Sequence, residues 1–294
     1  MLSISPTEEF IEFHGQVAST ILDKIINEKI GKNLLLDSTR NFIKRYKNIL
    51  IKAEPRVLLK VHEKFNSMKN GQDFESLKLC FNERAYKSQF QKKHSKEFLE
   101  ILGIDTCVYC NRNYTIQIVE NRARAELDHW FPKEIFPLLS LSLYNLIPSC
   151  HSCNHIKHNN TPDGGWANAL TNLIHPYLGT KDDYFLFSYY YDSINVPRTI
   201  TRSNSIKARK TIEFIKIDKI YDSHSNRELK DLLDLRYKYS KNYLDILVNK
   251  TFNHINISHD EVYRMVFGVT FNEKDFHQRP FSKFKKDITS ELLR

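Results

Sequence analysis

The sequences Cys107-Val-Tyr-Cys110 and Cys150-His-Ser-Cys153 are two cysteine pairs of the same C-x-x-C form, separated by 39 residues. A C-x-x-C turn can place two thiolates on one side of an ion, and two such turns complete the tetrahedron that Zn²⁺ prefers. Four thiolates leave no open coordination position, so the predicted zinc is structural and ties the ends of the segment together. Simple zinc ribbons have about 15 to 20 residues between their pairs, so the longer interval predicts a folded element inside it.

Other readings of the cysteines are simpler. The four paired cysteines could be buried thiols that hold no metal. The fifth cysteine, Cys80 in Leu77-Lys-Leu-Cys-Phe81, is predicted to be a core residue. Because the sequence shows no export signal, paired C-x-x-C sequences favour metal binding over disulfides.

The composition narrows the class of protein. The chain has 294 residues, of which 41% are hydrophobic and 27% are charged, as in soluble globular proteins. It has 8 glycines, about 2.7% against a usual ~7%, and neither G-x-G-x-x-G nor G-x-x-x-x-G-K-[ST] occurs, which argues against a glycine-cradled nucleotide site. No apolar run approaches ~20 residues and no signal-peptide pattern is present. These features predict a cytoplasmic protein without a membrane partner.

The net charge is positive and unevenly distributed. Lys and Arg number 44 against 35 Asp and Glu, which gives a net charge of +9 and a pI near 9.1. Residues 105–160 carry five basic and five acidic side chains, so the excess lies outside them. Arg40 to Lys69 holds nine basic and two acidic residues, and Arg202 to Lys219 holds six and two. Such runs predict phosphate contacts that carry no sequence information; the alternative is a pair of solvated helix faces.

Periodicity and composition predict three regions: a helical N-terminal region at 1–104, a compact module at 105–160 and a mainly helical C-terminal region at 161–294. In the first region, apolar residues at helical spacing predict helices, with a break at Pro55 and a further helix from Glu83 to Leu102. In the third region, helices and strands near Tyr184 to Tyr191 are predicted.

The predicted module has two strands, a loop and a short helix. Asn113–Val119 has the alternation of a strand, and Ala125–His129 is predicted to pair with it. Phe131–Pro148 contains Pro and Leu and is predicted to be a loop that leads to Cys150. A short helix is predicted to begin near Asn154.

Further residues in the module occur in a recognisable order. Asp128-His129 is followed by Asn145 and then by Asn154-His-Ile-Lys157, between and beside the cysteine pairs. This ordered set resembles the HNH endonucleases, whose ββα-metal motif is often held by two zinc knuckles. The resemblance covers residues 107–160. It implies an α+β protein in which a zinc-stapled ββα-metal core is embedded in mainly helical N- and C-terminal regions.

The resemblance implies a role for each of these residues. Hydrolysis of a phosphodiester requires an activated water and a cation at the phosphate oxygens. His129 is implied as the general base and Asp128 as a ligand of Mg²⁺ or another divalent cation. Asn154 is implied as the second ligand, where other family members carry His. Asn145 is expected to brace the loop and to orient His129 through backbone hydrogen bonds.

The ligand assignment leaves alternatives open. His155 and His158 are close enough to Asn154 in sequence to replace it as a metal ligand. His158 also stands where the family often has a glycine. Lys157 is expected to contact a phosphate or to pack against the motif. His151 is expected to be exposed to solvent and to have no role in the site.

A narrower resemblance extends beyond the module. The sequences that carry it are Glu126-Leu-Asp-His-Trp-Phe-Pro-Lys133, Ser140-Leu-Ser-Leu-Tyr-Asn-Leu-Ile-Pro-Ser-Cys150, His175-Pro-Tyr177 and Arg279-Pro-Phe-Ser-Lys-Phe284. They look like the nuclease subunit of Septu-type anti-phage systems, and related subunits accompany some retrons. In these systems the nuclease works with an ABC/AAA-like ATPase. The resemblance therefore implies that the helical regions dock on such a subunit, which agrees with the lack of a nucleotide motif in this chain.

The function predicted from the sequence is that of a metal-dependent HNH endonuclease, the effector of an ATPase-coupled defence complex, with DNA as the favoured substrate. RNA, including tRNA, is an alternative substrate for the same site. A non-catalytic zinc-stabilised adaptor for nucleic acid or protein is an alternative of another class. A stand-alone restriction or homing-type nuclease is a third.

Overall fold

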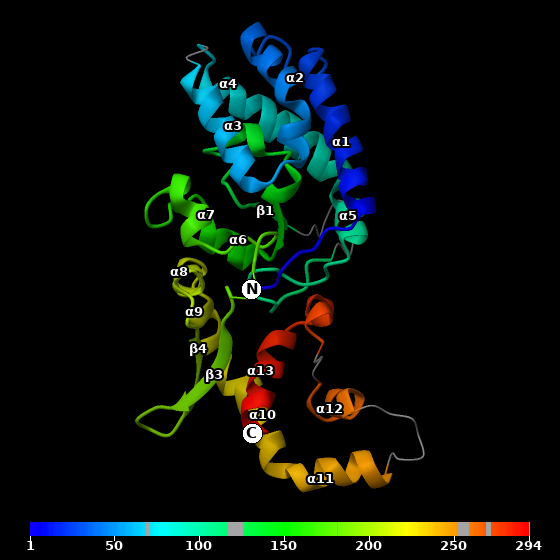
Figure 1. Cartoon of the computed structure of the whole chain (residues 1–294), viewed down its shortest axis with the longest axis vertical. Coiled ribbons are helices and arrows are strands. Elements are labelled where there is room, and N and C mark those ends of the chain that lie inside the picture. The colour runs from blue at the N-terminus through cyan, green and yellow to red at the C-terminus, as the bar shows by residue number, and fades with distance from the viewer. Residues whose placement is uncertain (69–70, 117–125, 181, 252–258, 269–271, 294) are drawn as a thin grey trace. The chain divides into compact units, whose positions relative to one another are not determined.

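The computed structural model describes residues 1–68, 71–116, 126–180, 182–251, 259–268 and 272–293. The fold is α+β, with helices and two small antiparallel sheets (Figure 1), which confirms the predicted class. The chain divides into two compact units. We call residues 3–108 and 115–179 the N-terminal unit, and residues 1–2, 109–114 and 180–294 the C-terminal unit. The three regions predicted along the sequence stay a prediction.

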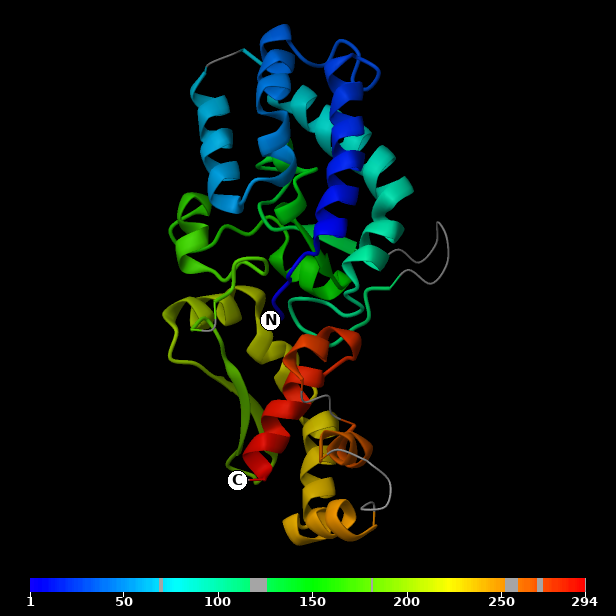
Figure 2. The ribbon, with the colours of Figure 1, turned by 45° about the vertical axis from the view of Figure 1, so that its right-hand side comes forward.

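Helices make up the first part of the N-terminal unit (Figures 1 and 2). They are α1 (Glu8–Ile26), α2 (Asp37–Lys52), α3 (Pro55–Ser67), α4 (Phe74–Lys78), the π-helix η1 (Leu79–Gln91) and α5 (Lys92–Leu102). Pro55 occupies the first turn of α3, where its missing N–H costs no helical hydrogen bond, so the predicted break is confirmed. The rings of Phe10 and Phe90 pack edge-to-face on Phe98, with centroids 4.7 and 5.6 Å away. All three side chains are fully buried, so this aromatic cluster joins α1, η1 and α5.

Two short strands and a helix follow in the same unit. Strand β1 (Glu126–His129) pairs antiparallel with β2 (Leu146–Ser149), and α6 (His151–Lys157) begins directly after β2. Between the strands lie the 3₁₀ turns η2 (Pro137–Leu139) and η3 (Leu143–Asn145); η4 (Trp166–Asn168) and α7 (Ala169–Asn172) follow α6. The predicted short helix is therefore present, and it begins at His151.

Among the described residues, the partner of β1 is not the predicted one. Strand β1 pairs with β2, which lies within and just after the segment predicted to be a loop. Residues 117–119 of the predicted first strand lie outside the described residues. In its described part, the Thr115 N–H donates to the Asp105 carbonyl at 2.7 Å. The reason for the error is that all four residues of β2 are buried, so β2 lacks the alternation of a half-buried strand.

The C-terminal unit is a β-hairpin with helices around it. Strands β3 (Leu186–Tyr191) and β4 (Pro197–Arg202) pair antiparallel, which confirms the strands predicted near Tyr184 to Tyr191. The helical elements are α8 (Ile206–Ile215), α9 (Ile217–Asp222), η5 (Ser225–Leu229), α10 (Lys230–Lys238), α11 (Lys241–Ile246), η6 (Leu247–Thr251), α12 (His259–Phe267), η7 (Glu273–Gln278) and α13 (Ser282–Leu292). Phe284 of α13 packs on Phe187 of β3 with ring centroids 5.4 Å apart, which fixes α13 against the hairpin (Figure 2).

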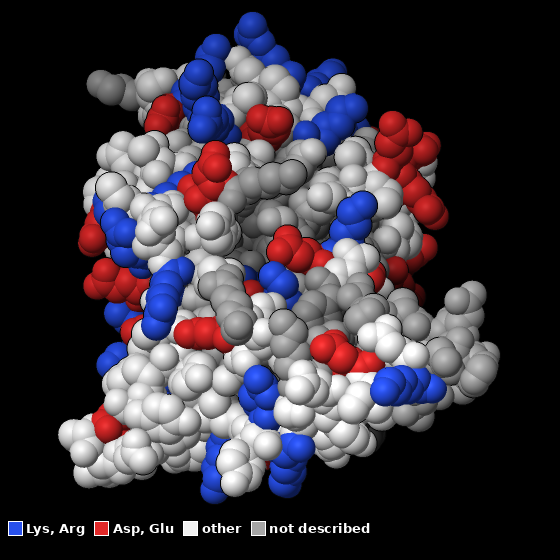
Figure 3. All heavy atoms as spheres, turned by 60° about the horizontal axis from the view of Figure 1, so that its bottom comes forward, with Lys and Arg blue, Asp and Glu red and all other residues white. Residues whose placement is uncertain are grey.

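The surface carries charges of both signs. On the face shown in Figure 3, Lys and Arg side chains lie among Asp and Glu side chains and do not merge into one basic area. None of the described helices combines the length and the apolar character needed to cross a membrane.

Candidate metal centre and active-site cavity

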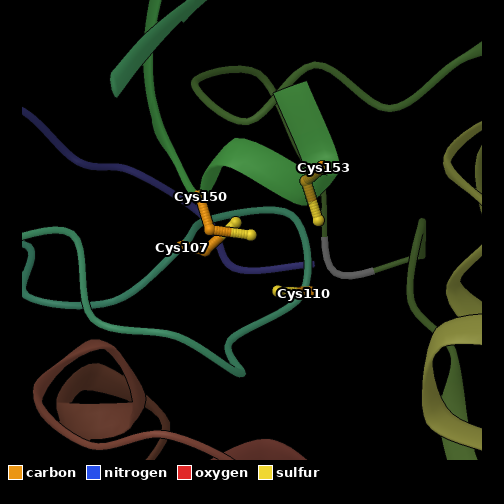
Figure 4. Close-up of side chains that lie close together, drawn as sticks. All are labelled: Cys107, Cys110, Cys150 and Cys153. Atoms are coloured by element: carbon orange, nitrogen blue, oxygen red, sulfur yellow. The ribbon is translucent and has the colours of Figure 1, made fainter. Parts of the chain in front are cut away.

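The four paired cysteines come together. The Sγ atoms of Cys107, Cys110, Cys150 and Cys153 all lie within 4.8 Å of one another, and all four residues are buried. Cys107 and Cys110 lie on a loop, Cys150 directly precedes α6, and Cys153 lies in its first turn (Figure 4). A tetrahedron with Zn–S bonds of ~2.3 Å has edges of about 3.8 Å, so small side-chain adjustments suffice. The four side chains fit a zinc ion, as the spacing predicts.

The backbone supports the cysteine turns. The Arg112 N–H donates to Cys110 Sγ at 3.4 Å, a contact that favours a thiolate over a thiol. Asn111, between them, has a φ of 50°, the left-handed region that Asn tolerates better than most residues. The Val108 N–H donates to the Pro148 carbonyl at 3.0 Å, so the first cysteine pair is tied to the end of β2.

Asp128, near the end of β1, lies beside Lys157 of α6. Lys157 Nζ is 3.2 Å from Asp128 Oδ1 and 3.1 Å from Oδ2, and it also donates to the His129 carbonyl at 2.7 Å. Both side chains are buried. Burial lowers the pKa of Lys157, and the Asp128 charge opposes this shift. Lys157 therefore packs inside the motif and joins α6 to β1.

His129, the last residue of β1, is held in a defined orientation. Its Nε2 lies 3.0 Å from the Ser140 carbonyl, which can only accept, so Nε2 carries the proton and Nδ1 is the acceptor nitrogen. The Tyr86 ring packs against the imidazole with centroids 4.4 Å apart. Burial lowers the pKa of His129 to about 3; the charges of Lys133 and Lys157 act in the same direction and the Ser140 carbonyl opposes them. The ring is neutral at neutral pH.

Asn145 holds the backbone that follows His129 and the backbone that precedes Ser140 through hydrogen bonds. Its Oδ1 accepts from the Phe131 N–H at 2.7 Å, and its Nδ2 donates to the carbonyls of Phe131 and Leu139 at 3.1 and 3.0 Å. Its own carbonyl accepts from the Trp130 N–H at 2.9 Å. These bonds fix both the chain that leaves His129 and the segment that leads to Ser140, whose carbonyl holds the His129 ring.

Asn154 is held by a residue to which the sequence prediction gave no role. Its Nδ2 donates to Glu126 Oε2 at 2.8 Å, which leaves Oδ1 as the atom that can bind a cation. The other oxygen, Glu126 Oε1, lies 2.7 Å from His151 Nδ1, and this hydrogen bond raises the pKa of His151. The sequence feature that could have identified Glu126 is its position two residues before Asp128. Residues two apart in a strand share a face, so Glu126 lies beside Asp128. His151 is exposed, as expected, but it has this partner.

A cavity of about 410 Å³ collects most of these groups. Its lining includes Tyr86, Glu126, Asp128, His129, His151, Asn154, His155 and His158. Asn145 is buried and is not part of this lining. The lining thus brings together residues with an imidazole, a carboxylate and a carboxamide group, and we call the cavity the β1–α6 cavity.

Comparisons with known proteins give one distant relative. A segment of 134 residues is 23% identical to the Septu protein PtuB of Bacillus thuringiensis, and it covers 45% of this chain and 44% of that protein. The chain thus spans less than half the length of the curated relative it matches. The match links the chain to Septu proteins, as the resemblance of the sequence implies. No family model matches the chain, and no solved structure matches it.

Proposed function

We propose that the chain is a metal-dependent endonuclease of the HNH type that hydrolyses phosphodiester bonds of nucleic acid. The observation that carries the proposal is the β1–α6 cavity, whose lining includes Asp128, His129 and Asn154. These residues come from a strand and the helix that follows its antiparallel partner. Their side chains supply the acceptor and the oxygen ligands that phosphodiester hydrolysis requires.

His129 is the proposed general base. Its Nε2–H is engaged by the Ser140 carbonyl, so the ring can rotate little and Nδ1 accepts the proton of a water molecule. A neutral ring can take up a proton, whereas a protonated ring cannot. With a pKa of about 3 the ring is neutral at pH 7 but is a weak base, so the proposal requires that the negative charge of a bound phosphate raise this pKa as the ring takes up the proton.

Asp128 and Asn154 are the residues that would hold a divalent cation. A carboxylate and an amide oxygen are hard ligands of the kind that Mg²⁺ prefers, and Glu126 leaves Asn154 Oδ1 available by engaging Nδ2. When bound, the cation would supply charge stabilisation at the phosphate oxygens. The four thiolates fit Zn²⁺ instead, and we assign them a structural role at the start of α6.

We further propose that this activity serves anti-phage defence, in a complex with an ABC/AAA-like ATPase. The match to a Septu protein supports the defence role. The proposal of an ATPase partner is supported by the resemblance of the sequence to the nuclease subunit of such systems. DNA is the proposed substrate, and RNA is the alternative for the same site.

One observation favours a non-catalytic adaptor as the second candidate. Lys157 occupies both oxygens of Asp128, and an ion pair of this kind competes with a cation. A cleavage assay separates the two. The purified chain, alone and with the ATPase, is offered supercoiled plasmid and a tRNA pool together, with and without Mg²⁺. Mg²⁺-dependent loss of one substrate supports the nuclease and identifies its substrate. If the protein contains zinc but cleaves neither substrate, the adaptor function is supported.

A further inference from the structure

We propose that a second cavity, formed in the C-terminal unit by the end of β4, α8 and α9, binds the phosphodiester backbone of nucleic acid. We call it the α8–α9 cavity. Its volume is about 670 Å³, and its basic lining residues are Arg202, Arg209, Lys216 and Lys219. This inference rests on the proposed function, since the nucleic acid bound there is the one that the nuclease would cut.

The four basic side chains reach the cavity from separate elements. Arg202 is the last residue of β4, Arg209 lies in α8 and Lys219 lies in α9. Lys216 ends α8 and precedes α9 with a φ of 60°, and this left-handed turn brings the two helices around the same cavity. The charged run from Arg202 to Lys219 that stood out in the sequence is therefore partly gathered around one concave surface.

Within the part of the chain that the structure describes, the four basic side chains of the cavity have no carboxylate partner, whereas neighbouring basic residues have one. Lys207, just outside the lining, pairs with Asp183 at 3.5 Å, and Arg198 of β4 pairs with Asp192 at 3.3 Å. Among the described residues, no Asp or Glu oxygen lies within ion-pair distance of the four basic groups that line the cavity. Each of them is exposed, so each is available to a ligand.

The sum of the charges favours an anion. The lining also contains Glu213 and Asp218, so four positive charges face two negative ones. Ser203 and Asn204 form another part of the lining, next to the N-terminus of α8, where Ser205 Oγ accepts from the Ala208 N–H at 3.1 Å. The positive end of the helix dipole adds to the field of the basic side chains there.

The chemistry fits phosphates rather than bases. Among the described residues that line the cavity, none has an aromatic ring on which a base could stack. Arg and Lys contacts to phosphates carry no sequence information. Arg209 is partly oriented, because its Nη1 donates to the Ser203 carbonyl at 2.8 Å. The expected role is therefore sequence-independent retention of the strand, with a strong dependence on salt.

The test compares two pairs of substitutions that remove the same charge from the same unit. Arg202→Gln/Lys219→Gln alters the α8–α9 cavity, and the control Lys230→Gln/Lys238→Gln alters exposed lysines of α10 that do not line it. Binding of the full chain to a labelled 24-bp DNA duplex, and to a 24-nucleotide RNA strand, is measured by fluorescence anisotropy over a salt series without added divalent metal.

The expected result is a shallower salt dependence for the cavity variant alone. The slope of log Kobs against log salt falls by about 1.8 for the duplex, or about 1.4 for the single strand, because each lost phosphate contact removes ~0.9 or ~0.7. The nucleic acid whose slope changes is the ligand. A slope equal to that of the control variant, or no binding by the unaltered chain, overturns the inference.

Cleavage assays on the same proteins keep the two proposals separate. A reduced slope in the cavity variant, with no Mg²⁺-dependent cleavage by the unaltered chain, supports the phosphate-binding cavity and argues against the nuclease. If the unaltered chain cleaves nucleic acid and the slope of the cavity variant is unchanged, the proposal of a phosphate-binding cavity is overturned and the proposed nuclease function is not affected.

Discussion

The carboxylate of Asp128 and the ammonium of Lys157 form a buried ion pair, with side-chain exposures of 5% and 1% and an Nζ–Oδ2 distance of 3.1 Å. The same ammonium donates to the His129 carbonyl. Lys157 thus links α6 to the end of β1, where the proposed general base lies. Its position explains how a motif of two short strands and one short helix holds a defined geometry.

Lys157→Met is expected to destabilise the N-terminal unit by about 3–5 kcal/mol, because it leaves the Asp128 carboxylate buried without its cation. The double variant Asp128→Asn/Lys157→Met is expected to recover part of this loss. Urea unfolding followed by tryptophan fluorescence measures both effects, since Trp130 and Trp166 both lie in this unit. Asp128→Asn alone completes the comparison. If the losses in Lys157→Met and Asp128→Asn add up to the loss in the double variant, the ion pair is not the cause.

Glu126→Ala is expected to weaken divalent-cation binding about 10- to 100-fold, as the loss of an outer partner of a metal ligand commonly does. Without the Glu126 carboxylate, Asn154 Nδ2 loses its acceptor and Oδ1 is no longer oriented. Glu126→Gln keeps an acceptor oxygen and is expected to lose less. Binding of Mn²⁺ measured by electron paramagnetic resonance tests this. His151→Ala is the control, because it removes the other partner of Glu126; a loss as large as that of Glu126→Ala would contradict the assigned role.

Removal of zinc is expected to unfold the region around the cysteines. One zinc ion per chain is expected by elemental analysis, and a strong chelator or Cys153→Ser is expected to lower Tm by more than about 10 °C. Cys80→Ser is the matched control, because Cys80 lies outside the cluster. A metal-free protein with the same Tm would show that the four cysteines are only packed thiols.

Acid is expected to destabilise the N-terminal unit in part through His14. Burial lowers the pKa of His14 to about 3, while the unfolded chain protonates it near 6.5. The unfolded state binds the additional proton below pH 6.5, so stability is complete above that pH and is lost as the pH falls toward 3. Between pH 7 and pH 5 the loss from this group is about 2 kcal/mol.

His14→Leu removes that titration and is expected to flatten the pH dependence by the same amount, measured by urea unfolding at the two pH values. The comparison uses the difference between the pH values, so a uniform loss of stability in the variant does not affect it. An unchanged pH dependence would show that His14 does not contribute in this way.

The parts of the site that the sequence could predict are those that depend on residue type and local spacing. Four cysteines in two C-x-x-C turns have few alternatives to a shared cluster, and Pro55 can begin a helix but disrupts the interior of one. The strand at β1 was also recognisable from its sequence. Each of these features follows from the chemistry of one residue or from a short repeat.

The features of the fold and the site that could not be predicted depend on contacts between residues that are distant in the sequence. The partner of β1 was missed because burial of every residue of β2 removes the alternation that marks a strand. Glu126 and Asn154 meet only when α6 lies across β1, and Lys157 was not expected to bind Asp128 for the same reason. The basic run from Arg202 to Lys219 was visible in the sequence, but the cavity that it lines required the fold.

The most direct test of the central claim is Mg²⁺-dependent cleavage by the unaltered chain, His129→Ala and His94→Ala, each with its zinc content and Tm measured. His94 lies in α5, outside the lining of the β1–α6 cavity, so it controls for the loss of a histidine. The account predicts cleavage by the unaltered chain and His94→Ala, and a loss of at least about 100-fold in His129→Ala with zinc retained. Equal cleavage by all three proteins would contradict the assignment of His129 as the general base.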